Sequence, residues 1–278
     1  CYTIEAEELI GTKIFLDISS VGATINIMMA AVAAQGETYI RNAAREPETE
    51  DLQSFLNALG CDVTGAGTSN IRVRGGTTAK STAEHTIMPD RIVAGTLLCG
   101  AAITGGEVEL HNVRPQHMGS MLSKLRETGC KIDCREDAIL LRGPERLQEI
   151  KLIETLPYPG FPTDMQAQFF ALATVAQGAC MIVENVFENR FKHGPELMRM
   201  GAVYTQKDRT AVIRGVEGLT GAQVTARDLR GGAALTLAGL KARGITTIYG
   251  VELIDRGYEA LDAQLRALGA HITREENL

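Results

Sequence analysis

The chain has 278 residues, of which 45% are hydrophobic, and a formal net charge of −6 at pH 7. This length allows two domains or one large one, and the composition is typical of a well-packed α/β protein. The negative charge makes nucleic acid a poor default partner, and no apolar stretch is long enough to cross a membrane. Six cysteines without a CxxC pair, and five histidines without ligand spacing, predict free thiols in a reducing cytoplasm and no metal site.

A unit of about 70 residues recurs four times along the chain, and such a period indicates a repeat architecture. The first helix of each copy is predicted to begin near Ser20, Pro89, Pro162 and Asp228. A short strand follows, then a junction with an arginine, then a second helix that stops at a glycine. The arginines are Arg45, Arg114, Arg190 and Arg256, and the glycines are Gly60, Gly129, Gly201 and Gly269. An arginine kept at one strand-to-helix junction predicts a face that gathers positive charge for an anionic ligand.

In the first copy, the apolar residues 24–34 predict a buried helix with Ser20 as N-cap and Gly36 as C-cap. Residues 37–40 predict a strand. Pro47 marks the start of the second helix, where its missing N–H costs nothing. The apolar face of that helix is predicted to consist of Leu52, Phe55, Leu56 and Leu59.

Each of the first three copies is predicted to end in a pair of strands. In the first copy these are residues 61–64 and 71–74, separated by Gly65-Ala66-Gly67. This glycine pair resembles part of a dinucleotide-binding turn, but it leads into a strand, which favours a plain hairpin loop. The second and third copies repeat the pattern with apolar helix positions Leu122, Leu125, Leu197 and Met198, strands 131–134 and 139–142, and strands around Val203 and Val212. The repeated unit is therefore β, α, β, α, β, β or a close permutation.

The fourth copy is shorter than the others. Its second helix is predicted from Leu261, Leu265 and Leu268, and a strand is expected near His271 and Ile272. The chain ends at Leu278, where the other copies form their last strand. We expect another segment to complete this sheet, because an open edge is a liability.

Several of these segments together resemble a known family. The most specific is LPYPGFPTDMQAQF at residues 156–169, and SVGAT at 20–24, VFENRF at 186–191, DLR at 228–230 and IDRGYE at 254–259 support it. They are similar, in the same order, to the UDP-N-acetylglucosamine 1-carboxyvinyltransferases, which are enolpyruvyl transferases of the EPSP synthase superfamily. The resemblance extends from Tyr2 to about Arg274.

The resemblance implies an α/β fold of the enolpyruvyl transferase type, an inside-out α/β barrel built from βαβαββ units. The family has two lobes of three units each, with the active site between the lobes. Residues 1–86 are then expected to be one repeat of the first lobe, which carries the catalytic loop, and residues 87–278 the three repeats of the second lobe. The chain resembles an N-terminally truncated fragment, so about the first third of the family chain is expected to be absent.

The family transfers the enolpyruvyl group of phosphoenolpyruvate to the 3-hydroxyl of UDP-N-acetylglucosamine and releases phosphate, as the first committed step of peptidoglycan synthesis. The resemblance therefore implies a cytoplasmic transferase with these two small-molecule substrates and no cofactor. The family's reactive cysteine loop and N-terminal lysine would lie upstream of Cys1, so we expect this polypeptide to be inactive alone. The 3-phosphoshikimate 1-carboxyvinyltransferases and a non-catalytic repeat scaffold are the alternatives.

The catalytic residues implied by the resemblance are Asp164, Arg230 and Arg256. Asp164 is expected to bind the sugar and to take the proton of the 3-hydroxyl, whereas its position at a helix start also suits a helix cap. The two arginines are expected to hold phosphoenolpyruvate, and guanidinium groups suit this role because they stay charged and donate paired hydrogen bonds. For these two arginines and for Arg190, surface salt bridges with Asp228 or Asp255 are the alternative.

The substrate-binding residues implied by the resemblance are Ser20, Val21, Gly22, Arg91, Thr163, Asp164, Val186 and Arg190. The first three match a segment that touches the nucleotide, where the N–H groups of a helix start suit a phosphate. The family often has a lysine shortly before this segment, and Ile18 occupies that place here. Structural roles stay open for Arg45 and Arg114, and the role of Arg91 at the lobe boundary is ambiguous.

Overall fold

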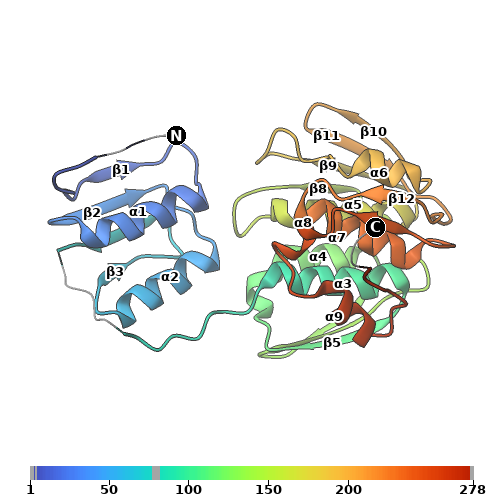
Figure 1. Cartoon of the computed structure of the whole chain (residues 1–278), viewed down its shortest axis with the longest axis horizontal. Helices are drawn as coiled ribbons and strands as arrows, with labels where there is room; N and C mark the ends of the chain where they lie inside the picture. Colours follow the sequence, from blue (N-terminus) through green and yellow to red (C-terminus); the bar gives the residue numbers. More distant parts are fainter. Residues whose placement is uncertain (1–2, 4, 77–81, 276–278) are drawn as a thin grey trace. The chain divides into compact units, whose positions relative to one another are not determined.

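The computed structural model describes residue 3 and residues 5–76 and 82–275. The chain divides after Met88 into two compact units, which Figure 1 draws in blue and in green to red. The first unit contains the residues up to Met88 together with Pro157–Pro159, and the second contains Pro89–Leu156 and the chain from Gly160 onward. None of the described helices is long and apolar enough to cross a membrane.

The first unit forms one complete βαβαββ repeat, as predicted. Its strands pair in the order β1-β2-β4-β3. Strands β1 and β2 are parallel because α1 crosses between them, whereas β4 pairs antiparallel with both β2 and β3. The elements are β1 (Lys13–Phe15), α1 (Val21–Ala33), β2 (Glu37–Arg41), α2 (Pro47–Ala58), β3 (Asp62–Thr64) and β4 (Asn70–Arg74).

The ends of these elements follow local chemistry. Ser20 caps α1 by accepting a hydrogen bond from the Ala23 N–H at 3.3 Å, as the sequence predicts. The other end differs: the C-cap of α1 is Ala34 in an extended conformation, and Gly36, at φ 87°, makes the turn into β2 instead. The predicted hairpin loop between β3 and β4 is confirmed.

The second unit contains the other three copies. The second copy has α3 (Arg91–Thr104), β5 (Glu107–His111), η1 (Pro115–Met118), α4 (Gly119–Glu127), β6 (Lys131–Cys134) and β7 (Ala138–Arg142). The third has β8 (Leu152–Glu154), η2 (Thr163–Met165), α5 (Gln166–Val175), β9 (Ala179–Val183), α6 (Gly194–Arg199), β10 (Val203–Lys207) and β11 (Thr210–Arg214). The fourth has β12 (Gln223–Thr225), α7 (Leu229–Lys241), β13 (Thr247–Tyr249), α8 (Glu252–Asp255) and α9 (Leu261–Ala267).

The third copy repeats the sheet of the first unit, with strand order β8-β9-β11-β10 and a parallel β8–β9 pair. The described strands of the second copy form the order β5-β7-β6, and those of the fourth form the parallel pair β12-β13. The glycines predicted to stop the second helices, Gly60, Gly129, Gly201 and Gly269, have φ between 89° and 99°. Residues with a side chain rarely adopt this conformation, which explains the repeated glycine.

The first helices of the three copies, α3, α5 and α7, pack against one another in the middle of the second unit. Every residue of α5 is buried, including the polar Gln166, Gln168 and Thr174, so this helix is enclosed by protein on all sides. In Figure 1, β5 and the β10–β11 pair lie outside this group of helices. The arrangement of helices inside and sheets outside confirms the predicted fold class.

Two predictions on the fourth copy and its neighbours are wrong. Residues 270–275 form no strand in the described structure, although a strand was predicted near His271 and Ile272. A single strand is not stable without a partner to accept its hydrogen bonds, and sequence pattern alone does not supply one. Met198 and Leu268 are 53% and 54% exposed, so they do not belong to the buried faces of their helices.

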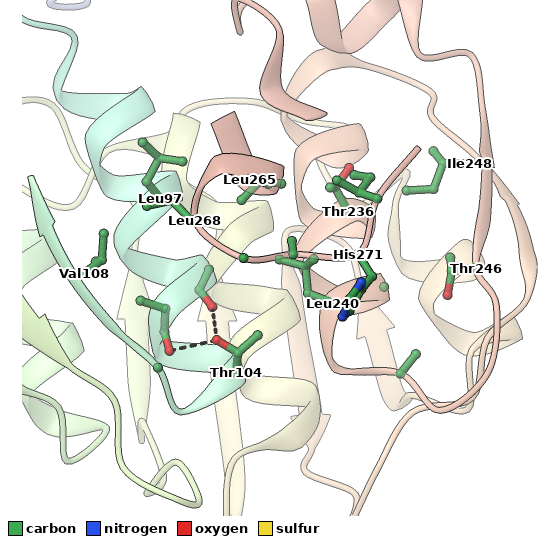
Figure 2. A pocket seen from close by; sticks show the side chains of 18 of the residues that line it. Leu97, Thr104, Val108, Thr236, Leu240, Thr246, Ile248, Leu265, Leu268 and His271 are labelled. Atoms are coloured by element: carbon green, nitrogen blue, oxygen red, sulfur yellow. Dashed lines mark hydrogen bonds between the residues drawn. The ribbon is translucent and has the colours of Figure 1, made fainter. Parts of the chain in front are cut away.

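A cavity of about 630 Å³ lies between α3, α7 and the end of the fourth copy. Figure 2 shows that Leu97, Leu240 and Leu265 contribute to its apolar lining and that His271 faces it. None of the residues predicted to bind substrate lines this cavity. The predicted catalytic residues lie elsewhere on the second unit.

Candidate active site

Asp164 lies between two arginines from different repeats. Its Oδ1 accepts a hydrogen bond from Arg190 Nη2 at 2.5 Å, and its Oδ2 accepts one from Arg230 Nη2 at 3.0 Å. The Asp164 side chain is 39% exposed, whereas those of Arg190 and Arg230 are 20% and 11% exposed. The three residues therefore form one partly open cluster, with the carboxylate as its most accessible part.

Asp164 does not cap a helix, which was the alternative role for it. It lies inside η2, whose N-cap is Pro162, and α5 then begins at Gln166 with Met165 as its N-cap. No side-chain hydrogen bond caps either element. The Asp164 carboxylate is therefore directed to the arginines and not to the backbone N–H groups of its own helix.

Arg190 comes from the junction between β9 and α6. Its guanidinium lies over the ring of Phe187, with Cζ 4.9 Å from the ring centroid, which is a favourable cation–π distance. This contact and the bond to Asp164 hold a residue that belongs to neither a helix nor a strand. The surface salt bridge with Asp228 or Asp255 that the sequence leaves open does not form.

Arg230 is the second residue of α7, which Asp228 caps by accepting the Gly231 N–H at 2.8 Å. The Arg230 Nε and Nη1 atoms are buried and have no hydrogen-bond partner within the described part of the chain. Burial lowers the pKa of Arg230, but its interactions with Tyr258 and Asp164 outweigh that effect and raise the pKa above its usual value. Two charged donors are thus available for an acceptor other than Asp164.

A buried hydrogen-bond network around Tyr258 supports the Arg230 guanidinium. The guanidinium lies over the Tyr258 ring, with Cζ 5.4 Å from the centroid. The Tyr258 hydroxyl, in turn, is 3.0 Å from Thr96 Oγ1 and accepts a hydrogen bond from Gln168 Nε2 at 3.1 Å. This network joins α3, α5 and the segment after α8. All three repeats of the second unit therefore help to position Arg230. No sequence motif pointed to this network.

Arg256 is exposed and follows α8. The next residue, Gly257, packs closely against α7: a Cβ there would be 2.3 Å from Leu229 Cδ1 and 3.3 Å from Arg230 Nη1. The backbone that carries Arg256 therefore adjoins Arg230. Asp255 pairs with Arg274 at 2.6 Å and not with a predicted site arginine.

Thr163 and Val186 are joined by a residue that the sequence analysis missed, Glu184. This carboxylate is fully buried, and it accepts hydrogen bonds from Thr163 Oγ1 at 2.9 Å and from the Val186 N–H at 2.9 Å. The available signal was a glutamate immediately after a buried strand, where the first two copies have Asn42 and Asn112.

The remaining predicted residues lie at other helix starts. Ser20, Val21 and Gly22 begin α1 in the first unit, and a Cβ at Gly22 would meet no atom within 4 Å. In the second unit, Arg91 begins α3 and is only 8% exposed. Arg45 and Arg114 are exposed at the junctions of the first two copies.

His193 is the most perturbed titratable residue near the cluster. It is 1% exposed, and both ring nitrogens lack a hydrogen-bond partner among the described residues. Burial lowers its pKa to about 4, so the ring is neutral at pH 7. Within the described ranges, no group of three or more His, Cys, Asp or Glu side chains is placed to hold a metal ion.

Comparisons with known proteins identify the relatives of this chain. Residues 2–276 match the family model described as EPSP synthase (3-phosphoshikimate 1-carboxyvinyltransferase). The chain is 53% identical over 270 residues to UDP-N-acetylglucosamine 1-carboxyvinyltransferase 1 of Caldanaerobacter subterraneus subsp. tengcongensis, covering 97% of this chain and 65% of that protein. It is 51% identical over 271 residues to the UDP-N-acetylglucosamine 1-carboxyvinyltransferase of Myxococcus xanthus, covering 98% and 64%.

Solved structures show the same fold. The enolpyruvyl transferase NikO from Streptomyces tendae superposes with a TM-score of 0.87 at 24% identity, over 96% of this chain and 66% of that one. EPSP synthase from Acinetobacter baumannii superposes with a TM-score of 0.69 at 22% identity, over 95% and 63%. The chain belongs to the EPSP synthase family of enolpyruvyl transferases. It spans slightly less than two thirds of the length of the two curated relatives above.

Proposed function

We propose that these residues form part of an enzyme that transfers the enolpyruvyl group of phosphoenolpyruvate to the 3-hydroxyl of UDP-N-acetylglucosamine and releases phosphate. The observation that carries the proposal is the Asp164 carboxylate held between Arg190 and Arg230, with two buried guanidinium donors left over. Relatives about half identical in sequence, which bear the name of this activity, support the choice of substrates.

In this proposal Asp164 takes the proton of the sugar 3-hydroxyl as its oxygen forms a bond to the enolpyruvyl group. A partly exposed carboxylate suits a general base because the hydroxyl can reach it. Thr163 and the Val186 backbone contact the sugar nucleotide, and Arg190 lies beside them. As the sugar oxygen adds to C2 of phosphoenolpyruvate, C3 takes up a proton from the acid that the family's reactive cysteine loop supplies. C3 then loses a proton, the C2–O bond to the phosphate breaks, and the enol double bond forms again.

Arg230 and Arg256 hold phosphoenolpyruvate and stabilise the charge that develops on it. The Arg230 guanidinium, which is largely buried and already positioned, does this without reorganising during the reaction. The free Nε and Nη1 donors of Arg230 fit a carboxylate or phosphate, which accepts paired hydrogen bonds. Ser20, Val21, Gly22 and Arg91 are further substrate contacts in this proposal. We place the reaction in the cytoplasm as the first committed step of peptidoglycan synthesis.

The same family includes enzymes that use shikimate 3-phosphate as the acceptor. Ligand binding to the native state raises its stability, so thermal unfolding of this chain with each acceptor distinguishes the two. We expect UDP-N-acetylglucosamine to raise the melting temperature and shikimate 3-phosphate to leave it unchanged. A rise with shikimate 3-phosphate alone would favour the other acceptor.

Turnover is tested in a full-length chimera. In it, the aligned part of this chain replaces its counterpart in the Caldanaerobacter relative, so that every residue of the proposed site in the second unit comes from this chain. We expect phosphate release that depends on both phosphoenolpyruvate and UDP-N-acetylglucosamine. A folded chimera that releases no phosphate, while the unaltered relative does, would contradict the proposal.

A further inference from the structure

Glu184 holds a large number of hydrogen bonds for one side chain. Its carboxylate is 0% exposed. Oε1 accepts from Thr155 Oγ1 at 2.8 Å and from the N–H groups of Val186 and Phe187 at 2.9 and 3.1 Å. Oε2 accepts from Thr163 Oγ1 at 2.9 Å. A buried charge is costly unless it is satisfied in this way, so the four bonds explain why the carboxylate is tolerated.

The first unit shows what the residue at the same position does in another copy of the repeat. There the residue directly after β2 is Asn42, and its Nδ2 donates one hydrogen bond, of 2.7 Å, to the carbonyl of Leu16 just after β1. This bond ties together the ends of two parallel strands. Glu184 does the equivalent in the third copy, since Thr155 directly follows β8. Its bonds to Thr163, Val186 and Phe187 are additional to that structural task.

The additional bonds connect both sides of the ion pair between Asp164 and Arg190. Thr163 precedes Asp164 in η2, and Val186 and Phe187 begin the segment that ends at Arg190. The Phe187 ring also lies beneath the Arg190 guanidinium. One carboxylate therefore fixes the start of both segments, and its two oxygens set the spacing between them.

We infer that Glu184 is a positioning residue, which holds the Asp164 carboxylate and the Val186–Arg190 segment in the geometry that the acceptor sugar nucleotide requires. This inference rests on the proposed function. A carboxylate is suited to the task because it accepts at both oxygens, as the three donor groups around Oε1 and the one at Oε2 require. Errors of about 1 Å in such a geometry cost up to about a hundredfold in rate.

The first test measures, in the 278-residue chain and independently of catalysis, whether Glu184 holds the Val186 and Phe187 amides and the Arg190 guanidinium in place. We compare Glu184→Ala and Glu184→Gln with Glu196→Ala, a control at another buried glutamate of the second unit, whose Oε2 accepts the Thr225 N–H at 3.1 Å. The readouts are hydrogen exchange at Val186 and Phe187 and the NMR signal of the Arg190 guanidinium. Glu184→Ala should remove the amide protection and shift the arginine signal toward that of free arginine, whereas Glu196→Ala should leave both unchanged.

The Glu184→Gln variant distinguishes a positioning role of Glu184 from a general contribution to folding stability. Gln keeps an acceptor for the two amides, and the Thr163 hydroxyl can rotate to accept from its Nε2. Glu184→Gln should therefore retain the arginine signal. If Glu184→Ala is as stable as Glu196→Ala and leaves the Arg190 signal and the amide protection unchanged, the inference is wrong.

The second test measures kinetics in the chimera. Glu184→Ala should lower kcat/KM for UDP-N-acetylglucosamine by about 10- to 100-fold, and change the KM for phosphoenolpyruvate by less than about threefold. Glu184→Gln should recover most of the loss, and Glu196→Ala should match the unsubstituted chimera. Equal losses in Glu184→Ala and Glu196→Ala would overturn the inference. An unsubstituted chimera without turnover would count against the proposed function, and the arginine signal would still decide the role of Glu184.

Discussion

Replacing Tyr258 by Phe tests the buried network beneath Arg230. The substitution removes one hydroxyl and leaves the ring, so the guanidinium keeps its aromatic support. Two hydrogen bonds are lost, those to Thr96 and Gln168. The bond from Gln168 Nε2 to Thr96 Oγ1, of 3.0 Å, remains, so neither partner is left without a bond.

The expected loss in free energy of unfolding follows from the two lost hydrogen bonds. A buried neutral hydrogen bond contributes about 1 kcal/mol net, and a larger penalty applies only where a partner is left unpaired. Tyr258→Phe should therefore lower the free energy of unfolding by about 1–2 kcal/mol. For a domain of this size that corresponds to a fall in melting temperature of about 2–8 °C.

The assay is thermal unfolding of the 278-residue chain, followed by circular dichroism. Tyr249→Phe is the matched control, because Tyr249 lies at the end of β13 and is 40% exposed. Its melting temperature should change by less than about 1 °C. If Tyr258→Phe changes the melting temperature no more than Tyr249→Phe does, the network does not hold the three repeats together and the reasoning fails.

Three further predictions concern the site and its surroundings. Asp164→Asn should lower kcat of the chimera by about 10²–10⁴, as loss of a general base does, with a change of only a few degrees in melting temperature because the side chain is 39% exposed. Phosphate release and thermal unfolding measure the two effects. Gly257→Ala should cost about 1–3 kcal/mol in urea unfolding, because its Cβ would lie 2.3 Å from Leu229 Cδ1. His193, with its pKa lowered to about 4 by burial, resists protonation in the folded state more than in the unfolded one. Stability should therefore be constant above about pH 6.5 and fall by about 3 kcal/mol as the pH drops toward 4, and His193→Gln should flatten the curve in urea unfolding at several pH values.

The repeated pattern predicted the architecture well because it depends on local signals. Apolar periodicity, an N-cap such as Ser20 and glycines with positive φ such as Gly60 each act within a few residues. The strand predicted near His271, which the described structure does not contain, shows the limit of such local signals, since a strand also depends on a partner from elsewhere. The exposure of Met198 shows the same limit, because burial depends on what packs against a helix.

Part of the candidate site, its aspartate and arginines, was predicted from the sequence, because these residues lie in recognisable motifs. The motifs around Asp164, Arg190 and Arg230 pointed to charged residues, and the structure brings these three together. The residues that support them were harder to predict, because Glu184 and Tyr258 act through bonds to residues distant in sequence. For Tyr258 no sequence motif was available, and for Glu184 the signal was only its place directly after a strand, where the first two copies have asparagine.

The repeats also explain why one aspartate among three similar ones differs in role. Asp90 and Asp228 stand at the N-caps of α3 and α7, and both carboxylates accept backbone N–H groups of their own helix. In the third copy, Pro162 occupies the corresponding N-cap, and a proline has no side-chain acceptor to offer. The aspartate comes two residues later, where no N–H group of its helix engages it, so its oxygens are available to the arginines of two neighbouring repeats. A small displacement along the chain thus turns a structural carboxylate into one that faces a cluster of positive charge.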